Sequence, residues 1–168
     1  MVGPPRTLAL VALGPVLTVA GETLRLWAVR HIGVISRTRA DRSGRLVVTG
    51  PFALVRNPLY VGNLLLWSGM SCWAGAVWAL VACWLVFFPY YAVMIRWEEY
   101  LLETRFGGPY RDYRRRVNTW FPRFPLSADV FASANYSWRE TLFSERGTLV
   151  AIAVMATLLS MKIAWVRL

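Results

Sequence analysis

Charged residues are scarce in this 168-residue chain, of which 17% are charged and 57% hydrophobic, with a mean hydropathy of +0.42. No charged residue occurs between Arg56 and Arg96. An uncharged run of that length is not expected in a soluble core. At ~1.5 Å per residue, its roughly 39 residues would extend about twice the ~30 Å thickness of the hydrocarbon layer. We therefore predict an integral membrane protein in which this run folds back as a helical hairpin.

Residues that bind metals or form disulfides are also few. The two cysteines, Cys72 and Cys83, lie inside the uncharged run without a Cys-x-x-Cys spacing, and His31 is the only histidine. This pattern supports neither a disulfide framework nor a zinc site, so no metal is predicted. The sequence has no Ser-His-Asp set and no Walker loop. Proteolysis, nucleotide hydrolysis and metal-dependent chemistry are therefore poor interpretations.

Basic residues are abundant, and the net charge is +10. Most of them lie in two hydrophilic stretches, Arg30–Arg56 and Arg96–Arg123, each beside an apolar run. This placement is the positive-inside pattern of membrane proteins and does not indicate a nucleic-acid surface. It predicts that both stretches face the cytoplasm, in a protein of a bacterial inner membrane that contacts anionic lipids.

The apolar pattern predicts an all-α membrane bundle of about four spans, forming a single domain over residues 1–168 with a motif core at about 21–125. We expect the hairpin turn near Gly69, Ser71 and Gly75, on the membrane side opposite the Arg-rich stretches and together with both termini. An amphipathic helix is expected at Trp97–Phe106, after the uncharged run ends at Arg96, and an interfacial helix at Tyr136–Arg146. The predicted spans are Leu8–Val29, Leu59–Ser71, Ala74–Ile95 and Gly147–Trp165.

The fold-back brings the charges at the two ends of the uncharged run to the same membrane side. Arg56 directly precedes Asn57-Pro58, a pair that favours the start of a helix, with asparagine as its cap. A guanidinium at that place can bind a carboxylate or phosphate, whereas Glu98 and Glu99 can hold a cation. A purely structural ion pair closing the hairpin is the alternative. Arg25 has two interpretations as well, either snorkelling to the interface or lining a polar pocket.

These residues carry a resemblance to a known family. Residues 56–62 read RNPLYVG and residues 98–102 read EEYLL. In order, spacing and membrane context they resemble the bipartite RHPxYxG…EExxL pattern of the isoprenylcysteine carboxyl methyltransferase and phospholipid methyltransferase superfamily. The match covers roughly residues 21–125.

The resemblance implies S-adenosylmethionine as methyl donor in a cytosol-facing pocket, with a lipophilic acceptor that enters from the bilayer. It places Arg56 and Glu99 closest to methyl transfer, as catalytic residues. The positions that match the cofactor pocket, or the segment after it, are Asn57, Pro58, Leu59, Tyr60, Gly62, Glu98, Leu102, Tyr110 and Tyr113.

Two departures from the family pattern stand out. Asn57 replaces the family histidine, which excludes a mechanism that needs a histidine base, and Asn118 replaces a proline. The acceptor is either the carboxylate of a prenylcysteine-like molecule or a lipid amine, so the sequence leaves open whether O, N or S is methylated. Two other functions compete with methyl transfer. They are a nicotinamide-dependent reductase of the sterol-reductase type and a non-catalytic membrane scaffold.

Overall fold

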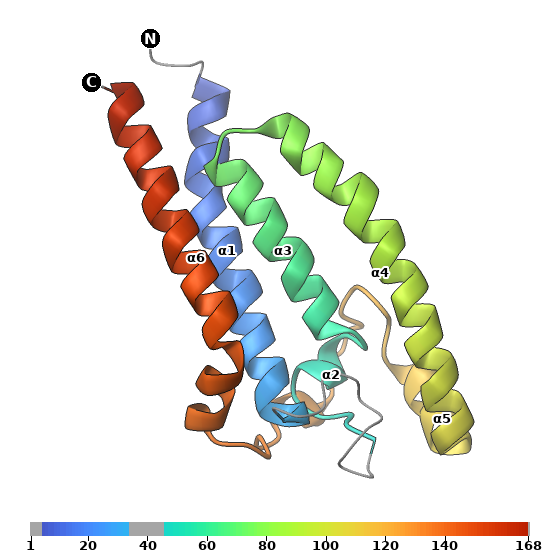
Figure 1. Cartoon of the computed structure of the whole chain (residues 1–168). Coiled ribbons are helices and arrows are strands. Elements are labelled where there is room, and N and C mark those ends of the chain that lie inside the picture. The colour runs from blue at the N-terminus through green and yellow to red at the C-terminus, as the bar shows by residue number, and fades with distance from the viewer. Residues whose placement is uncertain (1–4, 34–45, 168) are drawn as a thin grey trace.

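The uncharged run forms two antiparallel helices, as the sequence predicts (Figure 1). The structure is a computed structural model that describes residues 5–33 and 46–167, and these residues form helices and no strands. The predicted loop arginines Arg37, Arg39, Arg42 and Arg45 lie outside the described residues. The elements are α1 (Pro5–Ile32), α2 (Pro51–Leu54), α3 (Pro58–Trp73), α4 (Val77–Phe106), α5 (Gly108–Arg116), the 3₁₀ helix η1 (Ala128–Phe131) and α6 (Trp138–Arg167).

Helices α1 and α3 pack closely because glycines face each other across their interface. A Cβ built on Gly21 would lie 2.7 Å from the Gly62 carbonyl oxygen, and one on Gly69 would lie 2.6 Å from the Thr18 backbone nitrogen. Small residues let helix backbones approach each other where lipid supplies no hydrophobic driving force. Helix α6 packs against α1 and α4 against α3, so the α1–α3 pair forms the centre of the bundle (Figure 1).

Three helices are long and apolar enough to cross a membrane. They are Ala9–Ile32, Val77–Phe106 and Trp138–Trp165 among the described residues. Helix α3, the second of the four predicted spans, has 16 residues. Its length of roughly 24 Å at ~1.5 Å per residue is less than the ~30 Å hydrocarbon thickness. The protein is therefore a helical membrane protein with three full-length candidate spans and a shorter central helix.

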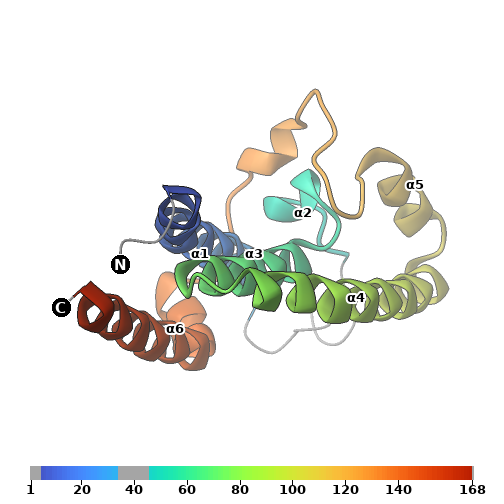
Figure 2. The ribbon, with the colours of Figure 1, turned by 90° about the horizontal axis from the view of Figure 1, so that it is seen from above.

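The Arg-rich end of the bundle carries the short elements. The α3–α4 turn, the start of α1 and the end of α6 lie at one end of the molecule, and α2 and α5 lie at the other (Figure 1). Seen along the helices, α2, α5 and η1 lie on one side of the row formed by α1, α3 and α4 (Figure 2). The predicted arrangement of the hairpin turn relative to the charged stretches is thus found in the structure.

Three predicted boundaries are wrong. Gly69 and Ser71 are helical, and the turn falls at Ala74–Ala76, where Gly75 has a φ of 68° that favours glycine. Residues 97–106 are helical as predicted, but they continue α4 without a break at Arg96. Residues 136–146 likewise do not form a helix of their own, because α6 runs from Trp138 through Gly147 to Arg167.

Candidate functional site

The guanidinium of Arg56 connects the two ends of the hairpin. Its Nε donates to Oε1 of Glu99 at 2.9 Å, and its Nη2 forms an ion pair with the same oxygen at 2.8 Å. Its Nη1 donates to the carbonyl oxygens of Val117 at 2.7 Å and Arg114 at 3.1 Å, and Nη2 also donates to Oγ1 of Thr119 at 2.5 Å. These four hydrogen bonds use most of the donor capacity of the guanidinium, which has five N–H groups. Arg56 is 7% exposed and holds α4 and the segment after α5 onto the start of α3.

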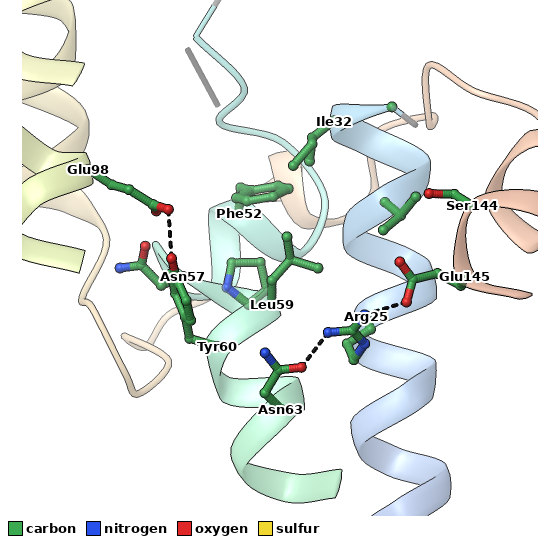
Figure 3. A pocket seen from close by; sticks show the side chains of 13 residues that line it. Arg25, Ile32, Phe52, Asn57, Leu59, Tyr60, Asn63, Glu98, Ser144 and Glu145 are labelled. Carbon is green, nitrogen blue, oxygen red and sulfur yellow. Dashed lines mark hydrogen bonds and ion pairs between the residues drawn. The ribbon is translucent and has the colours of Figure 1, made fainter. Parts of the chain in front are cut away.

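A second bond between the same two stretches lies beside a cavity. Tyr60 donates its hydroxyl to Oε1 of Glu98 at 2.6 Å. Both side chains line a cavity of about 220 Å³, which extends across the first turns of α3 toward α1 and α6 (Figure 3). Pro58, Leu59 and Phe52 supply apolar wall. Glu98, rather than its neighbour Glu99, therefore contributes the carboxylate that lines the cavity from α4.

Asn57 lines the same cavity and does not cap its helix. It occupies the N-cap position of α3, but its side chain makes no capping hydrogen bond, contrary to the sequence-based expectation. The residue is 5% exposed, and its Nδ2 atom has no hydrogen-bond partner among the described residues. A buried amide donor without a partner costs free energy, so a ligand that accepts from it would be stabilised. Figure 3 shows Asn57 beside Glu98 and Tyr60.

The other end of the cavity contains a polar cluster centred on Arg25. Its guanidinium donates to Oδ1 of Asn63 on α3 and to Oε2 of Glu145 on α6 (Figure 3). Its Nε lies 3.5 Å from Oε2 of Glu22, one turn earlier on α1. Of the two sequence-based interpretations of Arg25, the structure shows the pocket-lining one. Charged side chains inside spans are costly and commonly mark functional sites.

Asn63 and Glu145 were not expected at a site from the sequence. Asn63 lies one residue after the first motif, and Glu145 is separated from Arg25 by 120 residues. The only sequence signal was an acidic residue just before an apolar run, which is common at membrane interfaces. Glu145 can be identified as a site residue only once α6 is known to pack on α1.

The remaining predicted cofactor residues lie elsewhere. Gly62 packs against Arg25, since a Cβ there would be 2.6 Å from its Cγ atom. Leu102, Tyr110 and Tyr113 form a separate buried cluster that packs α5 against α4. Tyr113 also donates its hydroxyl to the carbonyl oxygen of Phe52 at 2.7 Å, which links α5 to α2.

Among the described residues that line the cavity, carboxylates outnumber cations. Its described lining has two carboxylates, Glu98 and Glu145, and one guanidinium, Arg25, which is already bound to Glu145 and Asn63. A cationic group near the Glu98 carboxylate would be attracted to it, and Asn57 presents there a donor that has no partner among the described residues. The arrangement therefore suits a ligand with a positive centre and a hydrogen-bond acceptor, next to an apolar wall.

Comparisons with known proteins point to one family. The sequence model of the phospholipid methyltransferase family matches residues 9–108. That segment runs from the first turns of α1 to the first residue of α5, so it contains both motifs and excludes α6.

Individual relatives carry several names. A nickel-cobalt-cadmium resistance protein of Alcaligenes xylosoxydans xylosoxydans is 31% identical over 70% of this chain and 52% of its own. A probable protein-S-isoprenylcysteine O-methyltransferase of Oryza sativa subsp. indica is 28% identical over 66% of this chain and 60% of its own. The phosphatidyl-N-methylethanolamine N-methyltransferase of Saccharomyces cerevisiae is 34% identical over 52% of this chain and 44% of its own. The chain thus spans about half the length of these curated relatives. No solved structure matches it.

Proposed function

Because this chain belongs to the phospholipid methyltransferase family, we propose that it is an S-adenosylmethionine-dependent membrane methyltransferase that acts on a lipophilic acceptor. The observation that supports the proposal best is the contact between the two motif stretches. The bonds Arg56–Glu99 and Tyr60–Glu98 join residues about 40 positions apart at a cavity on the Arg-rich end of the bundle.

The residues present fit the proposed donor. When bound, S-adenosylmethionine supplies an electrophilic methyl group on a cationic sulfonium, together with an ammonium and a carboxylate. The Glu98 carboxylate offers charge compensation to a cation in the cavity, and the unpaired Nδ2 of Asn57 offers a donor to a carboxylate. Tyr60 holds Glu98 in place through its hydroxyl. We assign donor binding to Asn57, Pro58, Leu59, Tyr60 and Glu98.

We assign Arg56 and Glu99 a positioning role in this reaction. The sequence suggested that Arg56 could orient an acceptor carboxylate, but four of its five guanidinium N–H groups donate to protein atoms in the structure, and the guanidinium also forms an ion pair with Glu99. Glu99 is not among the described residues that line the cavity, and its Oε1 accepts a hydrogen bond from Nε of Arg56 and forms an ion pair with Nη2. The pair fixes where α4 meets α3 and therefore where Glu98 stands. In-line methyl transfer depends mainly on such alignment, which can contribute several kcal/mol.

The acceptor proposed for this chain is a lipophile with a carboxylate or amine headgroup, as in the rice and yeast relatives. Val29, Ile32 and Leu59 give the cavity an apolar wall between α1 and α3, two helices of the membrane bundle. We infer that the headgroup enters along this wall from the leaflet on the Arg-rich side. By the positive-inside rule that side is the cytoplasm.

Calorimetry on the full chain in detergent tests the proposed cofactor. S-adenosylhomocysteine is expected to bind with a one-to-one stoichiometry, and NADPH is expected to give no heat above dilution. Binding of NADPH without S-adenosylhomocysteine would instead favour the reductase interpretation, and binding of neither would favour a scaffold.

A further inference from the structure

The segment that follows α5 exposes large aromatic side chains beside a membrane helix. The Trp120 ring packs on Phe88 of α4, with ring centroids 5.1 Å apart. Phe121 and Phe124 are 76% and 75% exposed. Exposed apolar surface of this size, in continuity with a lipid-facing helix, marks a contact with a partner or with lipid.

The position of Phe88 along α4 indicates how far the segment after α5 extends into the membrane. Phe88 precedes Arg96 by eight residues, so it lies roughly 12 Å farther into the membrane at ~1.5 Å per residue. The residues of α4 before Arg96 carry no charge. Trp120 therefore reaches the apolar part of the leaflet on the Arg-rich side. Arg56 holds the base of the segment, donating its backbone N–H to the Asn118 carbonyl oxygen at 2.8 Å.

A second cavity, of about 510 Å³, lies behind this segment between α2, α5 and η1. It is separate from the Asn57–Glu98 cavity, and it has both an apolar and a basic part. The apolar part includes Val48, Val117, Phe124 and Leu126.

Its basic part consists of the three arginines Arg115, Arg116 and Arg123. Arg123 donates to the carbonyl oxygen of Arg115 at 2.8 Å, which brings these two residues together across the cavity rim. None of the three forms an ion pair within residues 5–33 and 46–167. Asp129, the one acidic residue in the described lining, accepts a hydrogen bond from Ser127. The cavity thus has an uncompensated positive charge.

We propose that this second cavity binds an anionic phospholipid of the surrounding leaflet. The phosphate would lie between Arg115, Arg116 and Arg123, which suit planar recognition of phosphate oxygens. An acyl chain would lie along Phe124 and Leu126 toward the lipid-facing surface of α4. The proposal does not depend on methyl transfer, because none of these residues lines the Asn57–Glu98 cavity.

Native mass spectrometry of the full chain, released from detergent with graded phosphatidylglycerol or phosphatidylcholine, tests this site. We expect one phosphatidylglycerol to be retained at a concentration at least tenfold lower than phosphatidylcholine requires. Equal retention of the two lipids would overturn the proposal. So would displacement of bound phosphatidylglycerol by millimolar inorganic phosphate, which would mean that the cavity binds a free anion and not a lipid.

A charge-matched pair of double variants locates the binding. Arg115→Gln with Arg123→Gln should weaken phosphatidylglycerol retention by tenfold or more, since each basic residue near anionic lipid contributes measurably. Arg105→Gln with Arg111→Gln removes the same charge from the same end of the bundle, outside the cavity, and should change retention less than twofold. Equal loss in both double variants would contradict a defined site. If the first pair does not fold, the lipid preference of the wild-type chain still decides.

Discussion

The side chain of Asn57 does not make the capping hydrogen bond that its position in the sequence predicts. Asparagine commonly caps a helix with its side chain, and here it occupies the cap position of α3 without doing so. Its Nδ2 is buried and has no partner among the described residues. The side chain lines the cavity, where the family pattern has a histidine and where we propose that the donor binds.

We predict that Asn57→Ala weakens binding of S-adenosylhomocysteine by about tenfold, because a hydrogen bond to a charged group is lost. The melting temperature should change little, since no intramolecular bond to Nδ2 is removed. Calorimetry and thermal unfolding in the same detergent measure both quantities. Asn118→Ala is the matched control, because Asn118 contacts Arg56 through its backbone. Unchanged affinity in Asn57→Ala would remove this residue from the donor site.

The sequence predicted that Arg56 lies close to Glu98 and Glu99. An uncharged run of about twice the membrane thickness must fold back, so that its two ends lie on the same side of the membrane. The sequence did not predict which oxygen atoms and N–H groups of these residues could still bind a ligand. Arg56 looked like a free anion-binding group, whereas in the structure the backbone carbonyls of Arg114, in the last turn of α5, and of Val117, just after α5, use part of its donor capacity. Contacts of that kind depend on the path of an irregular segment, which has no periodic pattern to read.

At the scale of helices, the α1–α3 interface is set by glycines seven residues apart on each helix. Gly14 and Gly21 on α1 face Gly62 and Gly69 on α3. The sequence indicated Gly69 as part of a turn because glycine is common in turns. Packing explains it instead, since a side chain at Gly69 would meet the backbone of α1.

We predict that Gly69→Ala lowers the free energy of unfolding by about 2 kcal/mol, since overpacking a close interface forces the helices apart. Gly147→Ala on α6 is the control, because a Cβ there meets nothing within 4 Å. That change should be neutral or stabilising by ~1 kcal/mol, as alanine is the better helix former. Thermal unfolding in detergent gives both values, and a Gly69→Ala protein as stable as the control would show that the interface tolerates separation.

The start of α6 shows that helix boundaries cannot always be predicted from where polar residues give way to apolar ones. The sequence suggested a separate interfacial helix at Tyr136–Arg146, most of which is the stretch from Trp138 to Arg146. In the structure it is the first part of α6, and Glu145 lies 2% exposed against Arg25. A buried ion pair between residues 120 positions apart leaves no trace in local composition.

At the scale of the whole molecule, α6 is attached to the family-matched helices through this charged cluster. Arg25 compensates two carboxylates, Glu22 and Glu145, which come from α1 and α6. Removal of one partner from a buried pair leaves a charge without compensation and is strongly destabilising. The cluster therefore connects the stability of the bundle with the shape of the cavity.

We predict that Arg25→Met destabilises the protein more than Glu145→Gln does. The first change leaves two buried carboxylates without their cation, whereas in the second Arg25 keeps Glu22 and Asn63. Arg146→Gln, at an exposed position of α6, is the control and should be near neutral. Thermal unfolding in lipid nanodiscs ranks the three variants. If Glu145→Gln proves the more damaging change, Arg25 is not the centre of the cluster.

Transfer of labelled methyl groups from S-adenosylmethionine by the purified chain in nanodiscs tests the account most directly. The acceptors are a prenylcysteine analogue, an amino-phospholipid and a total bacterial lipid extract. The wild-type chain should label at least one acceptor. Glu98→Gln, which keeps an oxygen for Tyr60 but loses the charge, should reduce labelling at least tenfold, while Glu103→Gln on the same helix should not. No labelling by the wild-type chain, or equal labelling by Glu98→Gln, would contradict the assignment of methyl transfer to this cavity.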